Sequence, residues 1–254
     1  MVGFYYFRHL KSILGCKHAV TQKCESEPYA FSMALHTGEA PQSIMKNRKK
    51  MKACLEMGRD TVFVFANQTH GDQIAVIDEH CNRGWEEMNS AVKASDALIT
   101  NRKHIVLGIL TADCVPVLLM DTKRHVIAAI HAGWRGSKAH ITAKCIAKMS
   151  DIFSCEAQDI LAGIGPAIGQ CCYEVDSSVA DSFHKDHKVL SHTTQRYMLD
   201  LAEVNRQQLL DAGLLESHIE MSHLCTGCNR DRFFSYRKEQ GCSGRFISMI
   251  GLID

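Results

Sequence analysis

The sequence predicts an α+β fold in which helices and mixed sheets form layers. Three observations support this prediction. Short β-rich runs fill most of the middle of the chain, several of them are apolar throughout, and the segments between them have either hairpin or helix length. Continuously apolar runs are typical of strands covered on both faces. The two kinds of connection favour a layered arrangement of sheets and helices.

Three segments have the pattern of helices. Residues 41–57 begin with Pro41, which suits the first turn of a helix, and are followed by Gly58, which suits its end. Apolar side chains recur between them near helical spacing. The second predicted helix runs from about residue 137 to 153, and the third covers residues 199–212.

The other elements are predicted as strands from their β-rich composition. The chain contains no repeat, low-complexity segment or Pro/Gly/Ser-rich linker, so we expect a single domain over residues 1–254. The predicted strands are residues 61–66, 73–78, 96–100, 104–110, 115–121, 125–130, 159–164 and 245–250.

The composition is typical of a soluble globular protein, with 46% hydrophobic and 22% charged residues among 254. A net charge of +1 argues against nucleic-acid binding through a bulk basic surface. No apolar run approaches the ~20 residues that span a bilayer, and the N-terminus lacks the pattern of a signal peptide. We therefore expect a cytoplasmic protein without a membrane partner. Its twelve cysteines are then thiols, metal ligands or buried residues rather than a disulfide framework.

The most informative pattern is a potential metal ligand at the end of three β-rich runs. His70 follows the first of these runs, Asp113 and Cys114 interrupt the second, and His131 follows the third. Turns at strand ends aim polar side chains at a shared cleft. Two imidazoles and one thiolate have the composition of a catalytic zinc site that keeps a fourth position open. The alternative is a buried structural cysteine with two hydrogen-bonded histidines.

The segment that follows His131, HAGWRGS, suggests an anion site. Gly133 and Gly136 lead from a strand into a predicted helix, whose N-terminal N–H groups favour anions. Arg135 could add a charge-assisted contact. A plain turn with a surface arginine is the alternative.

Five short segments carry a further signal: QTHG, TADC, HAGWRG, GPAIGQCCYEV (165–175) and FFSYR (233–237). In sequence and in order they resemble the laccase-domain family, and the resemblance extends from about residue 18 to 252. The family's members bear polyphenol oxidase or multicopper oxidase names and include zinc-dependent purine nucleoside phosphorylases with adenosine deaminase activity. The resemblance implies a four-layer α/β/β/α sandwich and zinc ligands at His70, Cys114 and His131.

The resemblance also implies the substrates. They are phosphate and the purine nucleosides adenosine, inosine, guanosine and methylthioadenosine for phosphorolysis, with adenosine also deaminated to inosine. Phosphorolysis needs a cradle for the phosphate anion. The candidate anion ligands are Arg48, which resembles part of a family Asn-Arg pair, Arg135 and Arg237. For Arg48, in the run KNRKK, a solvated basic face is the alternative.

Gln68 and Asp113 are candidates to orient the zinc ligands, and a packed, hydrogen-bonded role is the alternative for both. Residues 21–38 depart from the family pattern, because Gln22 replaces an arginine and Ala34 an asparagine. If this loop contacts substrate, we expect an altered preference or rate. The sequence does not determine the oligomeric state.

Two other enzyme classes remain open. A copper-dependent polyphenol oxidase would need several coppers, yet none of the fourteen histidines forms an H-x-H pair. A single site with two histidines and one cysteine could still hold copper instead of zinc. A metal-free cysteine hydrolase would use Cys114 as nucleophile and His131 or His70 as base.

A zinc-stabilised structural or interaction protein is a third alternative, because Cys225 and Cys228 form half of a zinc ribbon. The second C-x-x-C is missing, and only Cys242 lies downstream, so we favour reduced, partly buried thiols. The adjacent Cys171 and Cys172 are expected to pack, since neighbouring cysteines seldom form a relaxed disulfide.

Overall fold

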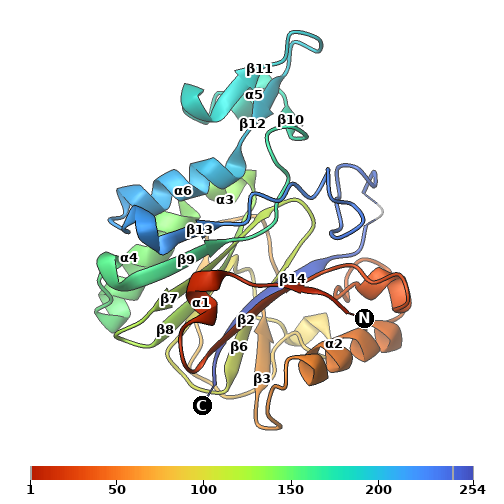
Figure 1. The fold of residues 1–254 in the computed structure, drawn as a ribbon, viewed down its shortest axis with the longest axis vertical. Helices are drawn as coiled ribbons and strands as arrows, with labels where there is room; N and C mark the ends of the chain where they lie inside the picture. Colours follow the sequence, from red (N-terminus) through yellow and green to blue (C-terminus); the bar gives the residue numbers. More distant parts are fainter. Residues whose placement is uncertain (1, 242, 254) are drawn as a thin grey trace.

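The structure is a computed structural model that describes residues 2–241 and 243–253. Two large mixed sheets lie face to face, with helices on their outer sides (Figure 1). In the first sheet β14 pairs antiparallel with both neighbours, whereas β3 pairs parallel with β6. Its strand order is β1 (Phe4–Tyr5), β2 (Cys16–Thr21), β14 (Phe246–Leu252), β6 (Ile105–Thr111) and β3 (Val62–Phe65).

The second sheet has six strands. The pairs β13–β9 and β4–β5 are parallel, and the other three pairs are antiparallel. Its strand order is β13 (Ile219–Met221), β9 (Ile160–Ile164), β7 (Val115–Asp121), β8 (Val126–Ala132), β5 (Ala97–Thr100) and β4 (Ile74–Val76).

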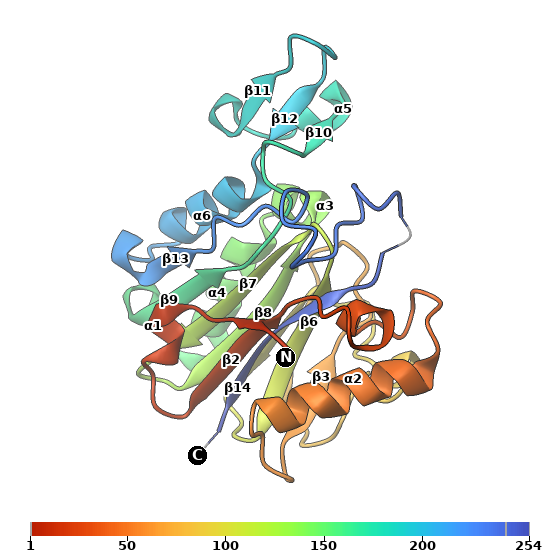
Figure 2. The same ribbon diagram turned by 45° about the vertical axis from the view of Figure 1, so that its right-hand side comes forward.

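A third, three-stranded sheet projects from one end of the body (Figures 1 and 2). It consists of β10 (Glu174–Val175), β12 (Tyr197–Leu199) and β11 (Lys188–Leu190). The helices are α1 (Arg8–Lys11), α2 (Pro41–Cys54), α3 (Trp134–Lys138), α4 (Ile141–Phe153), α5 (Ser177–Ala180) and α6 (Leu201–Asp211). Short 3₁₀ turns cover Pro28–Phe31, Met88–Ser90, Ala157–Asp159, Lys185–His187 and Glu216–His218.

Three hydrophobic cores define four layers. The inner core lies between the large sheets and includes Leu107 and Ile250 from the first, and Leu118 and Ile127 from the second. Because strands β6, β7, β8 and β14 are buried along their whole length, both faces of each are covered. This confirms the expectation drawn from their apolar runs.

The two outer cores attach helices to the sheets. Met51 of α2 packs with Phe63 and Met249 on the first sheet. Cys145 of α4 and Leu209 of α6 pack in the core on the outer side of the second sheet. The order of layers is therefore α/β/β/α, as predicted, and Cys145 is a core residue.

All eight predicted strand segments contain strands, and residues 41–57 and 199–212 contain α2 and α6. The helix predicted over 137–153 is two helices, α3 and α4, because His140 adopts a left-handed conformation with φ 60°. Strands β1, β2 and β10 to β13 were not predicted from the sequence. Strand β2 carries Lys17 and His18 in its interior, so its composition does not distinguish it from a loop.

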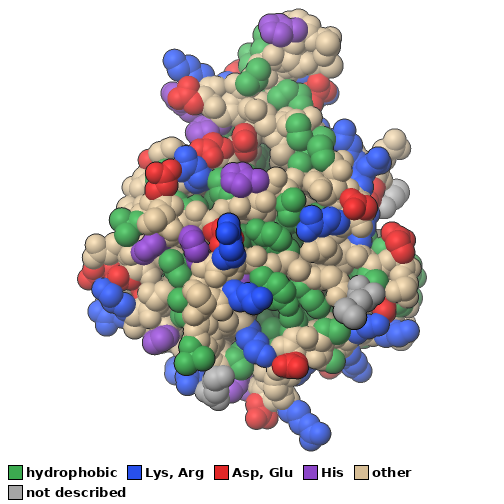
Figure 3. All heavy atoms as spheres, viewed as in Figure 1, with side chains coloured by type: hydrophobic (Ala, Val, Ile, Leu, Met, Phe, Trp, Pro, Cys, Tyr) green, Lys and Arg blue, Asp and Glu red, His purple; other side chains and the backbone are tan. Residues whose placement is uncertain are grey.

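No helix in the described part of the chain is long and apolar enough to cross a bilayer. On the face in Figure 3, acidic and basic side chains are interspersed rather than gathered by sign.

Candidate metal centre and active-site cavity

His70, Cys114 and His131, which are far apart in the sequence, meet in the structure. One donor atom from each lies within 4.8 Å of the other two. His70 follows β3, Cys114 lies in the turn where the chain passes from β6 of the first sheet to β7 of the second, and His131 lies in β8. The convergence predicted from the strand ends is therefore present.

The backbone at two of these turns is left-handed. His70 has φ 59° and Asp113, just before Cys114, has φ 93°. Such conformations are costly for residues other than glycine and concentrate at functional sites. Here the turns direct the side chains of His70 and Cys114 toward His131.

Asp96, which the sequence analysis missed, holds both histidines. It is fully buried, and its carboxylate accepts N–H groups from His70 (2.9 Å) and Gly71 (2.8 Å). Its Oδ1 atom also lies 2.8 Å from Nδ1 of His131. Burial opposes ionisation of Asp96, but the bond from His131 and the other donors outweigh it and lower the pKa to about 2. A carboxylate that holds Nδ1–H of a histidine leaves Nε2 free to bind a metal.

The neighbouring side chains shift the ionisation of Cys114 and His131. Burial alone would raise the pKa of Cys114, but His131 and His70 beside it lower the pKa to about 6. Burial alone would lower the pKa of His131, but Cys114 and Asp96 raise it to about 9. The two histidines therefore favour the thiolate form of the Cys114 sulfur, which is the form that binds metals and attacks electrophiles.

Two glycines of HAGWRG make room for this arrangement. A Cβ atom on Gly133 would lie 3.0 Å from Cδ2 of His70 and 3.3 Å from Sγ of Cys114. A Cβ atom on Gly136 would lie 2.7 Å from the carbonyl oxygen of Gly71. The donor set of two nitrogens and one sulfur, packed this tightly, fits a zinc ion with one open position.

The three donors face a cavity of about 500 Å³. This is within the roughly 300–1,000 Å³ usual for small-molecule sites. Three arginines and three aromatic side chains contribute to its wall. Its other lining residues include His36, Asn67, Gln68, Met88, Trp134, Arg135, Tyr173, Tyr236, Arg237 and Arg245.

Two of the predicted anion ligands line this cavity. The Arg135 guanidinium lies 4.4 Å from the centre of the Trp134 ring. Arg237 donates from Nη1 to the carbonyl of Glu174 (2.6 Å) and lies 5.2 Å from the Tyr173 ring. Both are therefore held by contacts at the cavity wall.

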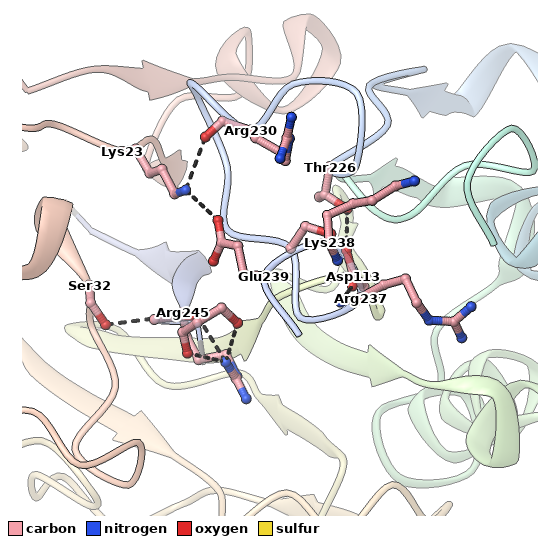
Figure 4. Close-up of polar contacts among 12 residues, drawn as sticks. Lys23, Ser32, Asp113, Thr226, Arg230, Arg237, Lys238, Glu239 and Arg245 are labelled. Atoms are coloured by element: carbon pink, nitrogen blue, oxygen red, sulfur yellow. Dashed lines mark hydrogen bonds and ion pairs between the residues drawn. The ribbon is translucent and has the colours of Figure 1, made fainter. Parts of the chain in front are cut away.

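Arg245 is a third lining arginine, which the sequence analysis did not identify. Its Nη1 atom donates to the carbonyl oxygens of Ser243 (2.6 Å) and Gly244 (2.9 Å), and its backbone N–H donates to Ser32 (Figure 4). It immediately precedes β14 rather than following a strand, so a search for polar residues at strand ends does not find it.

Arg48 lies elsewhere, and here the structure corrects the sequence-based assignment. Its side chain is fully buried and donates to the carbonyl oxygens of Met33, Gly84 and Trp85. The guanidinium lies over the rings of Phe65 (4.6 Å) and Trp85 (5.6 Å). It is neither a cavity residue nor part of a solvated basic face, because its donors are used inside the fold.

Gln68 and Asp113 position the loops around the site. The side-chain amide of Gln68 forms two hydrogen bonds with the backbone of Leu110, at 2.8 and 2.9 Å. Asp113 accepts the hydroxyl of Thr226 (2.6 Å) and the backbone N–H of Arg237 (2.6 Å), as Figure 4 shows. The hydrogen-bond partners of Gln68 and Asp113 belong to strands and loops of the cavity wall. The two side chains therefore hold that wall in place and do not contact the three donor atoms through these bonds.

The atypical loop at residues 21–38 reaches the cavity through His36. Ala34 is buried, and Gln22 accepts a hydrogen bond from Arg232 (3.3 Å). Of the described residues in this loop, His36 is thus the one placed to influence substrate binding.

A sequence model of the family described as multi-copper polyphenol oxidoreductase laccase matches residues 17–253. Purine nucleoside phosphorylase YlmD of Bacillus subtilis (strain 168) is 32% identical over 229 residues, 88% of this chain and 82% of the relative. Adenosine deaminase RL5, from an unknown prokaryotic organism, is 35% identical over 209 residues, 79% of each chain. The crystal structure of YlmD from Geobacillus stearothermophilus is 31% identical with a TM-score of 0.90, over 98% of this chain and 94% of that one. The chain therefore belongs to this laccase family, as its motifs predicted.

Proposed function

We propose that this protein is a zinc-dependent purine nucleoside phosphorylase that also deaminates adenosine. The observation that carries the proposal is the set of three donors, His70, Cys114 and His131, at a cavity lined by arginines and aromatic rings. The relatives named purine nucleoside phosphorylase and adenosine deaminase support the choice of reaction. The expected substrates are phosphate with adenosine, inosine, guanosine or methylthioadenosine.

Each part of the cavity has a role in this proposal. His70, Cys114 and His131 hold zinc, which supplies Lewis acidity that polarises a substrate atom or eases deprotonation of water. Arg135 and Arg237 bind the phosphate, and fixed guanidinium groups lower the cost of orienting that anion against the ribose. We place the enzyme in the cytoplasm, where reducing conditions protect the Cys114 sulfur from oxidation.

The aromatic residues suit the other half of the substrate. Trp134, Tyr173 and Tyr236 line the same cavity as the arginines. Aromatic faces stack on purine bases without depending on the exocyclic group. This arrangement fits an enzyme that accepts several purine nucleosides.

One observation favours a second function, a metal-free cysteine hydrolase. The Cys114 thiolate, the His131 imidazole and the Asp96 carboxylate lie next to one another in space, and Nδ1 of His131 is 2.8 Å from Oδ1 of Asp96. This is the order of groups in a cysteine nucleophile with its base and orienting acid. Such a hydrolase has no need of the third donor, His70. We therefore rank the hydrolase function below the zinc-dependent one.

Product analysis with and without phosphate tests the proposal. Adenosine with phosphate should give adenine and ribose 1-phosphate, and adenosine alone should give some inosine. Cys114→Ala should abolish both reactions, whereas the matched control Cys54→Ala, at an exposed cysteine, should retain them. Full activity in folded Cys114→Ala would contradict the proposal.

The other candidates give different results in the same preparation. A cysteine hydrolase would survive metal removal and lose activity with iodoacetamide. A copper oxidase would contain stoichiometric copper with an intense thiolate-to-copper absorption band. If elemental analysis finds that the bound metal is zinc, this result supports our proposal.

A further inference from the structure

A second cluster of thiols lies outside the cavity already described. One sulfur each from Cys171, Cys172, Cys225 and Cys228 lies within 4.8 Å of the other three. The two pairs are more than fifty residues apart in the sequence. Four potential metal ligands therefore meet at one point without any contribution from His70, Cys114 or His131.

The sheet explains why the two pairs meet. Strands β9 and β13 are parallel neighbours, with Ile164 opposite Met221. Parallel strands end at the same edge of a sheet. The chain after β9 carries Cys171 and Cys172, and the chain after β13 carries Cys225 and Cys228. An isolated bridge between Ala167 and Cys225 continues the pairing up to the cluster.

We propose that these four cysteines form a second metal site, a structural zinc site of the four-thiolate type. The Sγ atom of Cys228 lies 3.6 Å from the Sγ atoms of both Cys171 and Cys172. Zinc–sulfur bonds of about 2.3 Å in a tetrahedron place the sulfurs about 3.8 Å apart. A disulfide would need about 2.05 Å. Four protein ligands leave no open position, so the site is structural rather than catalytic.

The backbone around the cluster is shaped to present the sulfurs. The N–H of Gly169 donates to Sγ of Cys225 at 3.2 Å, and such a bond stabilises a thiolate. A Cβ atom on Gly227 would lie 3.1 Å from Sγ of Cys172, and one on Gly169 would lie 3.4 Å from Sγ of Cys225. Glycine at both positions allows the two turns to close on the same point.

The turns themselves are hydrogen bonded. The N–H of Cys172 donates to the carbonyl of Gly169 (2.9 Å), and that of Cys228 donates to the carbonyl of Cys225 (3.2 Å). Each C-terminal cysteine of a turn is thus fixed by its own backbone. The sequence alone could not identify partners for C-x-x-C at 225–228, and the fold supplies them. Cys242, the downstream cysteine considered there, lies outside the described residues.

The position of the cluster indicates what the metal stabilises. Thr226, between the paired cysteines, donates to Asp113, and Arg237 farther along the same loop also donates to Asp113 (Figure 4). Tyr173 directly follows the other pair and lines the cavity with Arg237. Zinc at the cluster would therefore join the two loops that carry this wall of the cavity.

Zinc stoichiometry of the full chain, purified under reducing conditions without chelator, tests the inference. We expect two zinc ions per chain in the unaltered protein, one in Cys228→Ser and one in Cys114→Ala. The matched control Cys54→Ser should keep two. This design separates the proposals, because loss of the ion at Cys114 leaves the second ion in place.

Two measurements avoid dependence on the folding of Cys228→Ser. Cys114→Ala loaded with cobalt should show intense thiolate-to-cobalt absorption typical of a tetrahedral four-sulfur site. In the unaltered protein, iodoacetamide should label exposed Cys54 and Cys81 at once, and the four clustered cysteines only after chelation. A single zinc that is unaffected by Cys228→Ser, labelling of the cluster without chelation, or a disulfide within it would overturn the inference.

Discussion

The Oδ1 atom of Asp96 lies 2.8 Å from Nδ1 of His131, and both side chains are buried. The same carboxylate accepts the backbone N–H groups of His70 and Gly71. One buried acid just before β5 thus fixes the ring of one candidate ligand and the backbone of another.

Asp96→Asn should therefore weaken zinc binding. The amide keeps the size of the side chain but removes the charge that holds Nδ1–H of His131, and the loss of such a partner typically costs 10- to 100-fold in metal affinity. Competition with a chelator measures this affinity. Asp121→Asn is the matched control, because Asp121 is equally buried in the same sheet but lies at the far end of β7. Equal zinc affinity in Asp96→Asn and the unaltered protein would show that Asp96 has no such role.

Gly133→Ala tests the packing of the ligands. The added methyl group would lie 3.0 Å from Cδ2 of His70 and 3.3 Å from Sγ of Cys114, so these side chains would have to shift away from it. A displacement of about 1 Å in a catalytic site can cost on the order of 100-fold, and we expect kcat/KM to fall by at least about tenfold. Gly58→Ala is the control, since its nearest atom would be 3.9 Å away. Unchanged activity in Gly133→Ala would be incompatible with the arrangement described.

Arg48→Ala should affect stability rather than phosphate binding. The substitution leaves the carbonyl oxygens of Met33, Gly84 and Trp85 without their donor and opens a cavity beside the rings of Phe65 and Trp85. We expect a loss of about 3 kcal/mol in the free energy of unfolding. Exposed Lys49→Ala should change it by less than about 0.5 kcal/mol. A raised KM for phosphate with unchanged stability would instead support Arg48 as an anion ligand.

His18 should make the stability depend on pH. Burial lowers its pKa from an ordinary 6.5 to about 4, and the neutral ring accepts the N–H of Phe7 at Nε2 (2.9 Å). Between these two values the unfolded chain binds a proton that the folded chain does not. Stability is therefore lost as the pH falls from 6.5 toward 4, by up to about 1.4 kcal/mol per pH unit.

Denaturant unfolding at several pH values measures this effect. His18→Gln keeps an acceptor for Phe7 but does not titrate, so its stability should fall less steeply over the same window. If the free energy of unfolding changes with pH in the same way in both proteins, His18 is not the cause of the pH dependence.

The strand ends could be predicted from the sequence because local composition determines them. His70, Cys114 and His131 each follow or interrupt an apolar run, and such runs become buried strands that aim the next side chain. Asp96 could not be assigned in this way. Its contact with His131 depends on the antiparallel pairing of β5 with β8, in which Ala97 lies opposite Ile130.

The same limit applies to Arg48 and to the cysteine cluster. The run KNRKK looks like a basic surface, and only packing against Phe65 and Trp85 shows that one of its arginines is interior. Cys171 and Cys228 meet because β9 and β13 are parallel neighbours. Pairings between distant segments carry no local signal, so these relationships appear only in the fold.

Removal and restoration of zinc, followed by phosphate-dependent release of adenine from adenosine, is the most direct test of the proposed function. The account predicts that metal removal abolishes adenine formation in the unaltered protein and that added zinc restores it. Undiminished adenine formation in protein shown by elemental analysis to be free of metal would contradict it.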